Sequence, residues 1–483
     1  MLFNSLEFII FLPIVFMIYW LLKNKLKTQN IFLVIVSYIF YGWWDWRFLS
    51  LIAFSSAVDF FVGIGLSKTE EKTKRKALLM TSIFVNLAFL GFFKYFNFFT
   101  ESFVDAFSFF GVSFNASRLN IILPVGISFY TFQTLSYSID VYNRKLEATK
   151  DIYNFFAYVS FFPQLVAGPI ERAANLLPQF DKKREFDRTQ AVDGMRQILW
   201  GFFKKIVIAD NCAEYANLIF NNSPDYSGST LVLGAIFFAF QIYGDFSGYS
   251  DIAIGISRLF GFNLMRNFAF PYFSRDIAEF WRRWHISLSS WFKDYLYVPL
   301  GGSRGGTWMK VRNTFIIFAV SGFWHGANWT FIVWGILNAV YFLPLLLASR
   351  NRDNIEIVAK GRILPGFKDL CSMLMTFGLT LFAWVFFRAE NIGHAFSYIS
   401  EIFSFSLFSV PDFPGIRGAL RTIILVAGFV VTEWLGRDQQ FALARMGFLE
   451  RSRILRWTTY AFIIFLTGFF MQTEETPFIY FQF

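Results

Sequence analysis

The sequence predicts an all-α polytopic membrane protein, and two features of its composition lead to this prediction. Hydrophobic residues make up 55% of the 483 residues and charged residues only 16%, whereas soluble proteins carry about 25% charged residues. Aromatic residues alone account for 22% of the chain. Polar side chains could not cover so much apolar surface in water, so we expect a lipid bilayer to surround the fold.

Apolar stretches of near-spanning length recur along the chain. A spanning helix needs about 20 mostly apolar residues, and several stretches are shorter, so we expect re-entrant or broken helices where protein surrounds the backbone. We expect about 11 true spans and additional interfacial helices, in a single membrane-embedded domain over residues 1–483. The candidate stretches are Leu6 to Leu22, Ile31 to Trp44, Phe48 to Leu66, Ala77 to Phe93, Ile121 to Ile139, Tyr153 to Gly168, Trp200 to Phe220, Leu231 to Tyr243, Phe315 to Trp324, Trp329 to Leu347, Leu370 to Phe387, Leu420 to Leu435 and Trp457 to Met471.

Basic loops set the predicted orientation. Lys23 to Lys27 carries three lysines, and Lys68 to Lys76 carries four lysines and one arginine against two glutamates. The turn between these two loops, Asp45 to Arg47, is nearly neutral. Because Lys and Arg gather in cytoplasmic loops, we expect both basic loops inside, and the N-terminus and the tail after Met471 on the outer face.

The cysteine, histidine and charge totals exclude several classes of protein. The two cysteines, Cys212 and Cys371, cannot build a disulfide framework or a cysteine metal cluster. The three histidines, His285, His325 and His394, lie far apart in the sequence, so we expect no metal site. The net charge of +10 is explained by basic cytoplasmic loops, and we expect no nucleic-acid partner.

His325 lies in SGFWHGANW, Ser321 to Trp329, between two apolar stretches. If Arg312 and Arg350 are both cytoplasmic, the chain enters the membrane and returns between them. A helix rises about 20 Å from Arg312 to His325, well inside an apolar layer about 30 Å thick. An ionisable side chain at that depth is a functional candidate, and a hydrogen-bonded packing histidine is the alternative.

The segment Phe280 to Tyr295 places aromatic residues on one side of a helix and basic or polar residues on another. This pattern is typical of a helix lying in the membrane interface. His285 is an exception, since it could line a pocket instead of facing water. The glycine-rich run that follows, Val298 to Gly306, allows a tight turn and close approach to a ligand, although it lacks the end of a phosphate-binding P-loop.

Seven Lys or Arg residues lie from Arg275 to Arg312. They would attract an anionic ligand such as the polyphosphate of coenzyme A or an acidic carrier protein, and positive-inside topology explains the same charges. Two other stretches, Gln241 to Asp251 and Phe161 to Arg172, carry acidic residues in apolar surroundings. These acids are costly there unless paired, and the nearby Gly and Pro predict broken helices beside a cavity; the acids are Asp245, Asp251 and Glu171.

Six stretches resemble one family closely. They are LPVGISFYTFQ (Leu123 to Gln133), FFPQLVAGPIER (Phe161 to Arg172), YGDFSGYSDIAIG (Tyr243 to Gly255), FWRRWHISLSSWFKDYLYVPLGG (Phe280 to Gly302), the WHGANW around His325 and PFIYFQF (Pro477 to Phe483). Together they resemble the membrane-bound O-acyltransferase family, in its bacterial alginate O-acetyltransferase-like branch. The resemblance implies a ring of tilted helices around a thin partition with a central catalytic cavity.

The same resemblance implies an enzyme with His325 at the catalytic centre and His285 as the second family histidine. Such proteins take an acyl group from a cytoplasmic thioester and deliver it across the membrane; in this branch an acetyl group finally reaches a sugar hydroxyl. We expect no bound cofactor, acetyl-CoA or another acyl thioester as donor, and Arg282, Arg283 and Arg304 as donor-binding residues. A separate extracytoplasmic SGNH-type acetyltransferase and polysaccharide synthesis or export machinery are the implied partners, at a bacterial inner membrane.

The chemistry of acyl transfer agrees with these roles. A thioester is already activated, so the enzyme must deprotonate a hydroxyl and stabilise an oxyanion. A neutral imidazole, with a reference pKa of about 6.5, suits the first task. The acceptor could instead be peptidoglycan or cellulose. The alternatives outside catalysis are a transporter, with Asp59, Asp140 and Asp245 as intramembrane ion sites, and a non-catalytic scaffold of polysaccharide export.

The C-terminal run Pro477 to Phe483 is apolar, so we expect it to fold back into the protein. Tyr480 carries the only hydroxyl of this run. A phenol, with a reference pKa near 10, is a better leaving group than a sugar alkoxide. Tyr480 is therefore a candidate acyl relay, and packing is its alternative role.

Overall fold

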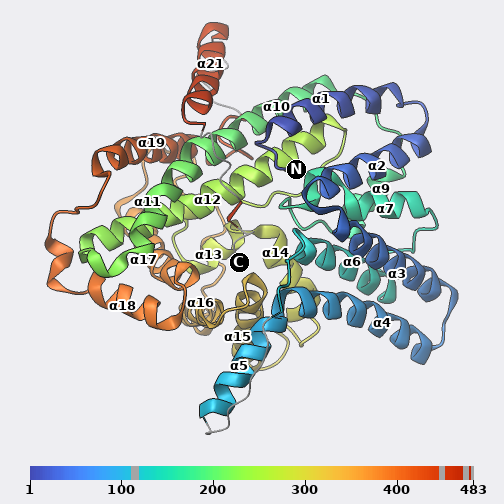
Figure 1. Ribbon diagram of the computed structural model, residues 1–483, viewed down its shortest axis with the longest axis horizontal. Helices are drawn as coiled ribbons and strands as arrows, with labels where there is room; N and C mark the ends of the chain where they lie inside the picture. Colours follow the sequence, from blue (N-terminus) through green and yellow to red (C-terminus); the bar gives the residue numbers. More distant parts are fainter. Residues whose placement is uncertain (110–118, 445–451, 472–477, 480–483) are drawn as a thin grey trace. The chain divides into compact units, whose positions relative to one another are not determined.

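The computed structural model describes residues 1–109, 119–444, 452–471 and 478–479. All regular elements within these residues are helices and none is a strand, which confirms the predicted all-α class (Figure 1). The chain divides into two compact units, unit 1 with Met1–Ala191 and Ile256–Met265, and unit 2 with Val192–Gly255 and Arg266–Phe483. The single membrane domain over residues 1–483 stays a prediction.

Unit 1 consists of apolar helices that pack largely on helices that are not their neighbours in the sequence. Within it α3 packs on α4 and α6, and α2 packs on α7. The chain then continues through α10 (Arg188–Phe202) into unit 2. The other α-helices of unit 1 are α1 (Leu6–Leu21), α2 (Leu26–Asp45), α3 (Leu49–Lys68), α4 (Lys72–Leu90), α5 (Phe96–Phe109), α6 (Ile127–Tyr142), α7 (Ile152–Ser160), α8 (Phe162–Leu165) and α9 (Ala173–Phe180).

A broken helix between Phe161 and Arg172 is confirmed, because α8 ends at Leu165 and the chain up to Arg172 is not helical. Glu171 in this segment is fully buried. Its carboxylate accepts hydrogen bonds from the side-chain amide of Asn175 and the backbone N–H of Met265. Burial raises the pKa of Glu171 to about 7. The two hydrogen bonds come from uncharged groups, so Glu171 is stabilised by neutral donors as well as by the charge of Arg172.

Unit 2 contains the longest helix and all three histidines. Its helices are η3 (Phe203–Ala209, a π-helix), α11 (Asp210–Asn221), α12 (Gly228–Leu259), α13 (Ile277–Arg283), α14 (Ile286–Phe292), η6 (Lys293–Tyr297, a π-helix), α15 (Thr307–His325), α16 (Trp329–Leu347), α17 (Phe367–Arg388), α18 (Ile392–Ile402), α19 (Ile416–Leu435) and α21 (Arg453–Phe469). The last four residues of α12 extend into unit 1.

The predicted break in the stretch Gln241 to Asp251 is wrong, because α12 runs through it as one continuous helix of 32 residues. Its glycines serve close packing. A Cβ added to Gly244 would lie 2.9 Å from the carbonyl oxygen of Lys204, and one on Gly248 would lie 2.8 Å from that of Gly201. The absent side chains let the backbone of α10 and η3 approach α12 closely.

Six helical segments of the described residues are long and apolar enough to cross a membrane. The predicted total of about 11 spans stays a prediction. The six segments are Leu26–Lys68, Lys72–Ser108, Gly228–Leu259, Trp329–Leu347, Phe367–Arg388 and Ile416–Leu435.

Helices α15 and α16 form a tight hairpin around two glycines (Figure 1). A Cβ on Gly322 would lie 2.2 Å from the carbonyl oxygen of Phe331, and one on Gly335 would lie 2.2 Å from that of Phe318. The two glycine Cα atoms lie beside each other at the crossing. This crossing fixes the end of α15, where His325 lies, against α16.

We predict that Gly335→Ala destabilises the protein, because the new methyl group clashes with a backbone oxygen that cannot rotate away. Overpacking of this kind costs about 1–3 kcal/mol, so the thermal unfolding midpoint in detergent should fall by about 1–3 °C for a chain of this length. Gly428→Ala in α19 is the matched control, since no atom lies within 4 Å of its added Cβ. Equal midpoints for the two variants would contradict the close crossing.

Candidate functional site

His325 is the last residue of α15 and is only 3% exposed. Its ring centroid lies 4.9 Å from that of Trp324, 5.1 Å from that of Trp334 and 5.3 Å from that of Phe387. The helix from Arg312 to His325 is continuous. The imidazole is therefore buried among aromatic rings.

His285 lies at a sharp turn between α13 and α14. The single interfacial helix predicted over Phe280 to Tyr295 is wrong, because α13 ends at Arg283 and α14 begins at Ile286. His285 adopts a left-handed backbone conformation, with φ of 43°, and is 1% exposed. A non-glycine residue in this region is strained. The strained backbone of His285 is stable only because neighbouring residues hold the turn in place.

Asn267 supplies much of that support. Its backbone oxygen accepts the N–H of Ile286 at 2.9 Å, and its Oδ1 accepts the hydroxyl of Ser287 at 2.9 Å. Its Nδ2 donates to the hydroxyl of Ser250 in α12 at 3.1 Å. Asn267 could not be selected from the sequence, because its position relative to the turn depends on the fold and its own segment carries no recognisable motif.

The two histidines are brought side by side, with ring centroids 6.4 Å apart. The ring of Phe246, in α12, packs edge-on against His285 at 4.6 Å. His285 lies outside the six apolar segments, and complete burial lowers its pKa to about 3. It is therefore neutral at physiological pH. The third histidine, His394, lies elsewhere in unit 2, 3.0 Å from the hydroxyl of Ser223.

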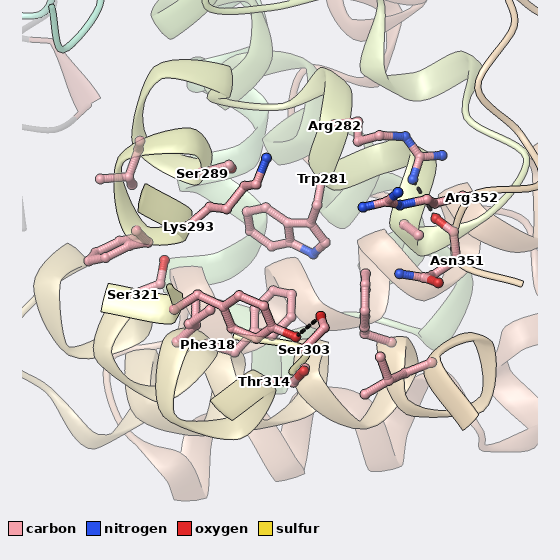
Figure 2. Close-up of a pocket in the computed structure, with 17 residues that line it drawn as sticks. Trp281, Arg282, Ser289, Lys293, Ser303, Thr314, Phe318, Ser321, Asn351 and Arg352 are labelled. Atoms are coloured by element: carbon pink, nitrogen blue, oxygen red, sulfur yellow. Dashed lines mark hydrogen bonds between the residues drawn. The ribbon is translucent and has the colours of Figure 1, made fainter. Parts of the chain in front are cut away.

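A cavity of about 340 Å³ is lined in part by residues of α13 and α14, the two helices that the turn at His285 joins; Figure 2 shows its lining side chains. Arg282, Asn351 and Arg352 gather at one side, away from Ser321, and Lys293 points toward the middle. The lining residues are Ala278, Trp281, Arg282, Leu288, Ser289, Phe292, Lys293, Tyr297, Ser303, Thr314, Ile317, Phe318, Ser321, Phe342, Leu346, Asn351 and Arg352.

The cavity lies along α15, and neither His325 nor His285 lines it. Ser321 lines it and precedes His325 by one helical turn. Trp281 also lines it, and its ring centroid lies 5.6 Å from that of Trp334, which contacts His325. One side of the cavity is thus cationic, and Ser321 and Trp281, which are linked to His325 through α15 and Trp334, line another.

The three arginines predicted to bind a donor occupy different surroundings. Arg282 lines the cavity and donates to the backbone oxygens of Asn351 at 2.7 Å and Asn354 at 2.8 Å. Arg283 is buried and paired with Glu279 at 2.7 Å. Arg304 is exposed and does not line this cavity. The cavity adds Lys293 and Arg352, which sequence analysis did not select.

The glycine-rich run after η6 forms the expected tight turn, since Gly301 and Gly302 both have positive φ. Its backbone is bound to α15, because the amide of Asn313 donates to the oxygens of Leu300 at 3.2 Å and Gly302 at 3.1 Å. This loop therefore positions Ser303 at the cavity.

Two buried acids of unit 2, Asp245 and Asp251, are paired with lysine, whereas the buried Glu279 is paired with arginine. Lys204 lies 2.8 Å from Asp251 and 3.4 Å from Glu433. Lys205 lies 2.8 Å from both Asp210 and Asp245. The pairing itself was predicted, but the partners come from η3, which the sequence assigned to an apolar stretch. In unit 1, Asp59 instead accepts hydrogen bonds from neutral side chains, namely Ser82, Asn86 and Ser138.

The predicted return of the C-terminal tail is confirmed for Phe478 and Ile479, which are each 1% exposed. The ring centroid of Phe478 lies 5.0 Å from that of Tyr249 and 5.9 Å from that of Phe246. Tyr480, the candidate relay, lies outside the described residues.

A buried histidine pair in an apolar helical chain suits a membrane-embedded transferase, and the comparisons identify the class. Residues 144–387 match the membrane-bound O-acyltransferase family. The chain belongs to this family and is a membrane-embedded O-acyltransferase. The predicted resemblance and enzyme class are therefore confirmed, against the alternatives of a transporter and a non-catalytic scaffold.

Individual relatives cover almost the whole chain. It is 38% identical to the probable alginate O-acetylase AlgI of Azotobacter vinelandii, over 92% of this chain and 86% of that protein. It is 36% identical to the protein of the same name in Pseudomonas putida, over 100% of both. It is also 33% identical to a peptidoglycan O-acetyltransferase of Helicobacter pylori, over 100% of this chain and 98% of that protein.

Proposed function

We propose that this enzyme takes an acetyl group from a cytoplasmic acyl thioester and passes it across the membrane to an extracytoplasmic polysaccharide. The observation that supports the chemistry best is the buried pair of His325 and His285, 6.4 Å apart by ring centroids. The names of the relatives support a glycan acceptor. Identities of 38% and 36% to alginate O-acetylases favour an alginate-like exopolysaccharide.

His325 acts as the general base in this proposal. Its imidazole takes the proton of the acceptor hydroxyl as the hydroxyl oxygen attacks the thioester carbonyl carbon. The tetrahedral intermediate collapses with cleavage of the C–S bond, and the proton passes from His325 to the departing thiolate. Water-poor aromatic surroundings strengthen each electrostatic interaction in this step. The backbone around Gly326 and the indole of Trp324 are proposed to stabilise the oxyanion.

The donor enters through the cationic cavity. Arg282, Lys293 and Arg352 provide positive charge for phosphate groups, and Trp281 and Phe318 provide apolar walls for the arm that carries the thioester. A volume of about 340 Å³ accommodates such an arm and the thioester, with the bulky phosphate-bearing part outside. Acetyl-CoA and an acyl-carrier protein both have this form.

We predict that Arg282→Gln raises the KM for acetyl-CoA about tenfold, because a charge-assisted contact to phosphate is worth roughly 1.5–3 kcal/mol before solvent screening. The turnover number should change little, and the KM difference should shrink with added salt. Arg304→Gln is the matched control, because Arg304 is exposed and does not line the cavity. A correctly folded variant with Arg282, Arg283 and Arg304 all changed to Gln should have the same KM for acetyl-CoA as Arg282→Gln. An unchanged KM would show that these arginines do not bind the donor and serve only the membrane topology.

We further propose a bacterial inner-membrane location with both termini outside, and an extracytoplasmic SGNH-type acetyltransferase as partner. Peptidoglycan is the second candidate acceptor, favoured by the full-length match to the Helicobacter pylori enzyme. Deleting the gene and measuring alkali-released acetate separately from exopolysaccharide and from peptidoglycan distinguishes the two. Acetate unchanged on every cell-envelope glycan would contradict the proposal.

A further inference from the structure

The tail residue Ile479 is bound through its backbone to a buried acid. Its N–H donates to Oδ2 of Asp245 at 2.6 Å. Both residues are almost fully buried, with exposures of 1% for Ile479 and 2% for Asp245. Since the contact uses the backbone N–H, it fixes the path of the chain and not only a side chain.

The other oxygen of Asp245 belongs to an ion cluster. Oδ1 lies 2.8 Å from the ammonium of Lys205, which lies equally close to Oδ1 of Asp210. One cation thus serves two buried carboxylates. A buried carboxylate that shares its cation with a second acid is stabilised by a further hydrogen-bond donor. The N–H of Ile479 is such a donor to Asp245.

Asp245 directly precedes Phe246, the aromatic residue that contacts His285. Phe246 packs edge-on against His285 at 4.6 Å, and its ring lies 5.9 Å from that of Phe478. The hydrogen bond to Ile479 and the packing of Phe478 therefore hold these two tail residues on the part of α12 that contacts His285. Ile479 also directly precedes Tyr480 in the sequence.

We propose that Asp245, held by Lys205, is a positioning residue that keeps the C-terminal tail beside His285 during acyl transfer. This inference rests on the proposed function. Loss of the contact frees the tail and slows transfer after donor binding, so the turnover number falls and the donor KM does not change.

The test compares Asp245→Asn with Asp210→Asn. Each variant removes one carboxylate from the same lysine and leaves Lys205 with one acidic partner, but only Asp245 touches the tail. The side-chain amide of asparagine has only one accepting oxygen, and its other group is an NH₂ donor. At position 245 this NH₂ group therefore faces either the ammonium of Lys205 or the N–H of Ile479, both of which are themselves donors. Hydrogen exchange of the C-terminal peptide, measured by mass spectrometry on the full chain in nanodiscs, should be at least tenfold faster in Asp245→Asn only.

Acetyl transfer is then measured in the same preparations. We expect at least a tenfold lower turnover number for Asp245→Asn, less than a threefold change for Asp210→Asn, and an unchanged acetyl-CoA KM in both. Equal tail exchange in the two variants would overturn the contact. Fast exchange with a normal turnover number would overturn the positioning role. The exchange measurement needs no substrate, so a wild-type protein that acetylates nothing would overturn the proposed function separately.

Ile479→Pro provides a second variant in case Asp245→Asn does not fold. Proline removes the donor N–H and leaves all three charges of the cluster in place, so the helices keep their ion pairs. The tail peptide should again exchange at least tenfold faster, and the turnover number should again fall. Wild-type exchange of the tail in Ile479→Pro would contradict the inference.

Discussion

Replacing His325 with alanine should reduce acetyl transfer about a thousandfold or more, because a positioned general base contributes about 10²–10⁴ in rate. His325→Gln should be equally inactive, although glutamine fills most of the space and retains hydrogen-bonding groups. The rings of Trp324, Trp334 and Phe387 that surround His325 carry no group able to take over the base function. The rate is measured as acetyl-CoA-dependent acetylation of the polymer.

His394→Ala is the matched control for a histidine removed from the same unit. His394 contacts Ser223 and not the histidine pair, so its replacement should leave the rate within about threefold of wild type. His285→Ala should lie between the two, since His285 is predicted to contribute less to the chemical step. Membrane level and elution as a single species verify folding. Near-normal acetylation by His325→Gln would refute the general-base role.

Tyr480→Phe should abolish delivery of acetate to the polymer while preserving membrane level. The change removes only the hydroxyl, so a packing role predicts almost no effect, whereas a relay role predicts complete loss. A phenyl ester stays activated because phenol, with a pKa near 10, leaves more readily than a sugar alkoxide. The buried neighbours Phe478 and Ile479 provide a fixed backbone from which such a relay could act.

Tyr460→Phe in α21 is the matched control for loss of a tyrosine hydroxyl. Peptide mass spectrometry after brief incubation with acetyl-CoA should detect an acetyl adduct in the C-terminal peptide of the wild type and of Tyr460→Phe. The adduct should be absent from Tyr480→Phe. Normal polymer acetylation in Tyr480→Phe would contradict the relay role and support a packing role for Tyr480.

The membrane helices and the burial of His325 could be predicted from the sequence because they depend on local properties. Apolar stretches of sufficient length have one main way to satisfy their backbone in lipid, which is a helix. The distance from Arg312 to His325 follows from helical rise, and the flanking glycines Gly322 and Gly326 are visible in the sequence. The acyltransferase class followed from long motifs of high specificity.

The surroundings of His285 could not be predicted in this way. Helical spacing over Phe280 to Tyr295 assumes a straight helix, but the chain turns at His285 because Asn267 binds the start of α14. The same limit applied to the arginines. Arg282 and Arg283 are adjacent in sequence, yet one lines the cavity and the other is paired with Glu279.

The sequence by itself determined that this chain is an all-helical membrane O-acyltransferase with His325 buried near the end of a helix. Only the tertiary structure decided that Lys205 pairs with Asp245, that His285 meets His325, and that the tail binds α12. The physical reason is that helix formation and burial in lipid depend on neighbouring residues along the chain. Ion pairs and ring contacts depend on which helices lie side by side, and that is a property of the whole packing arrangement.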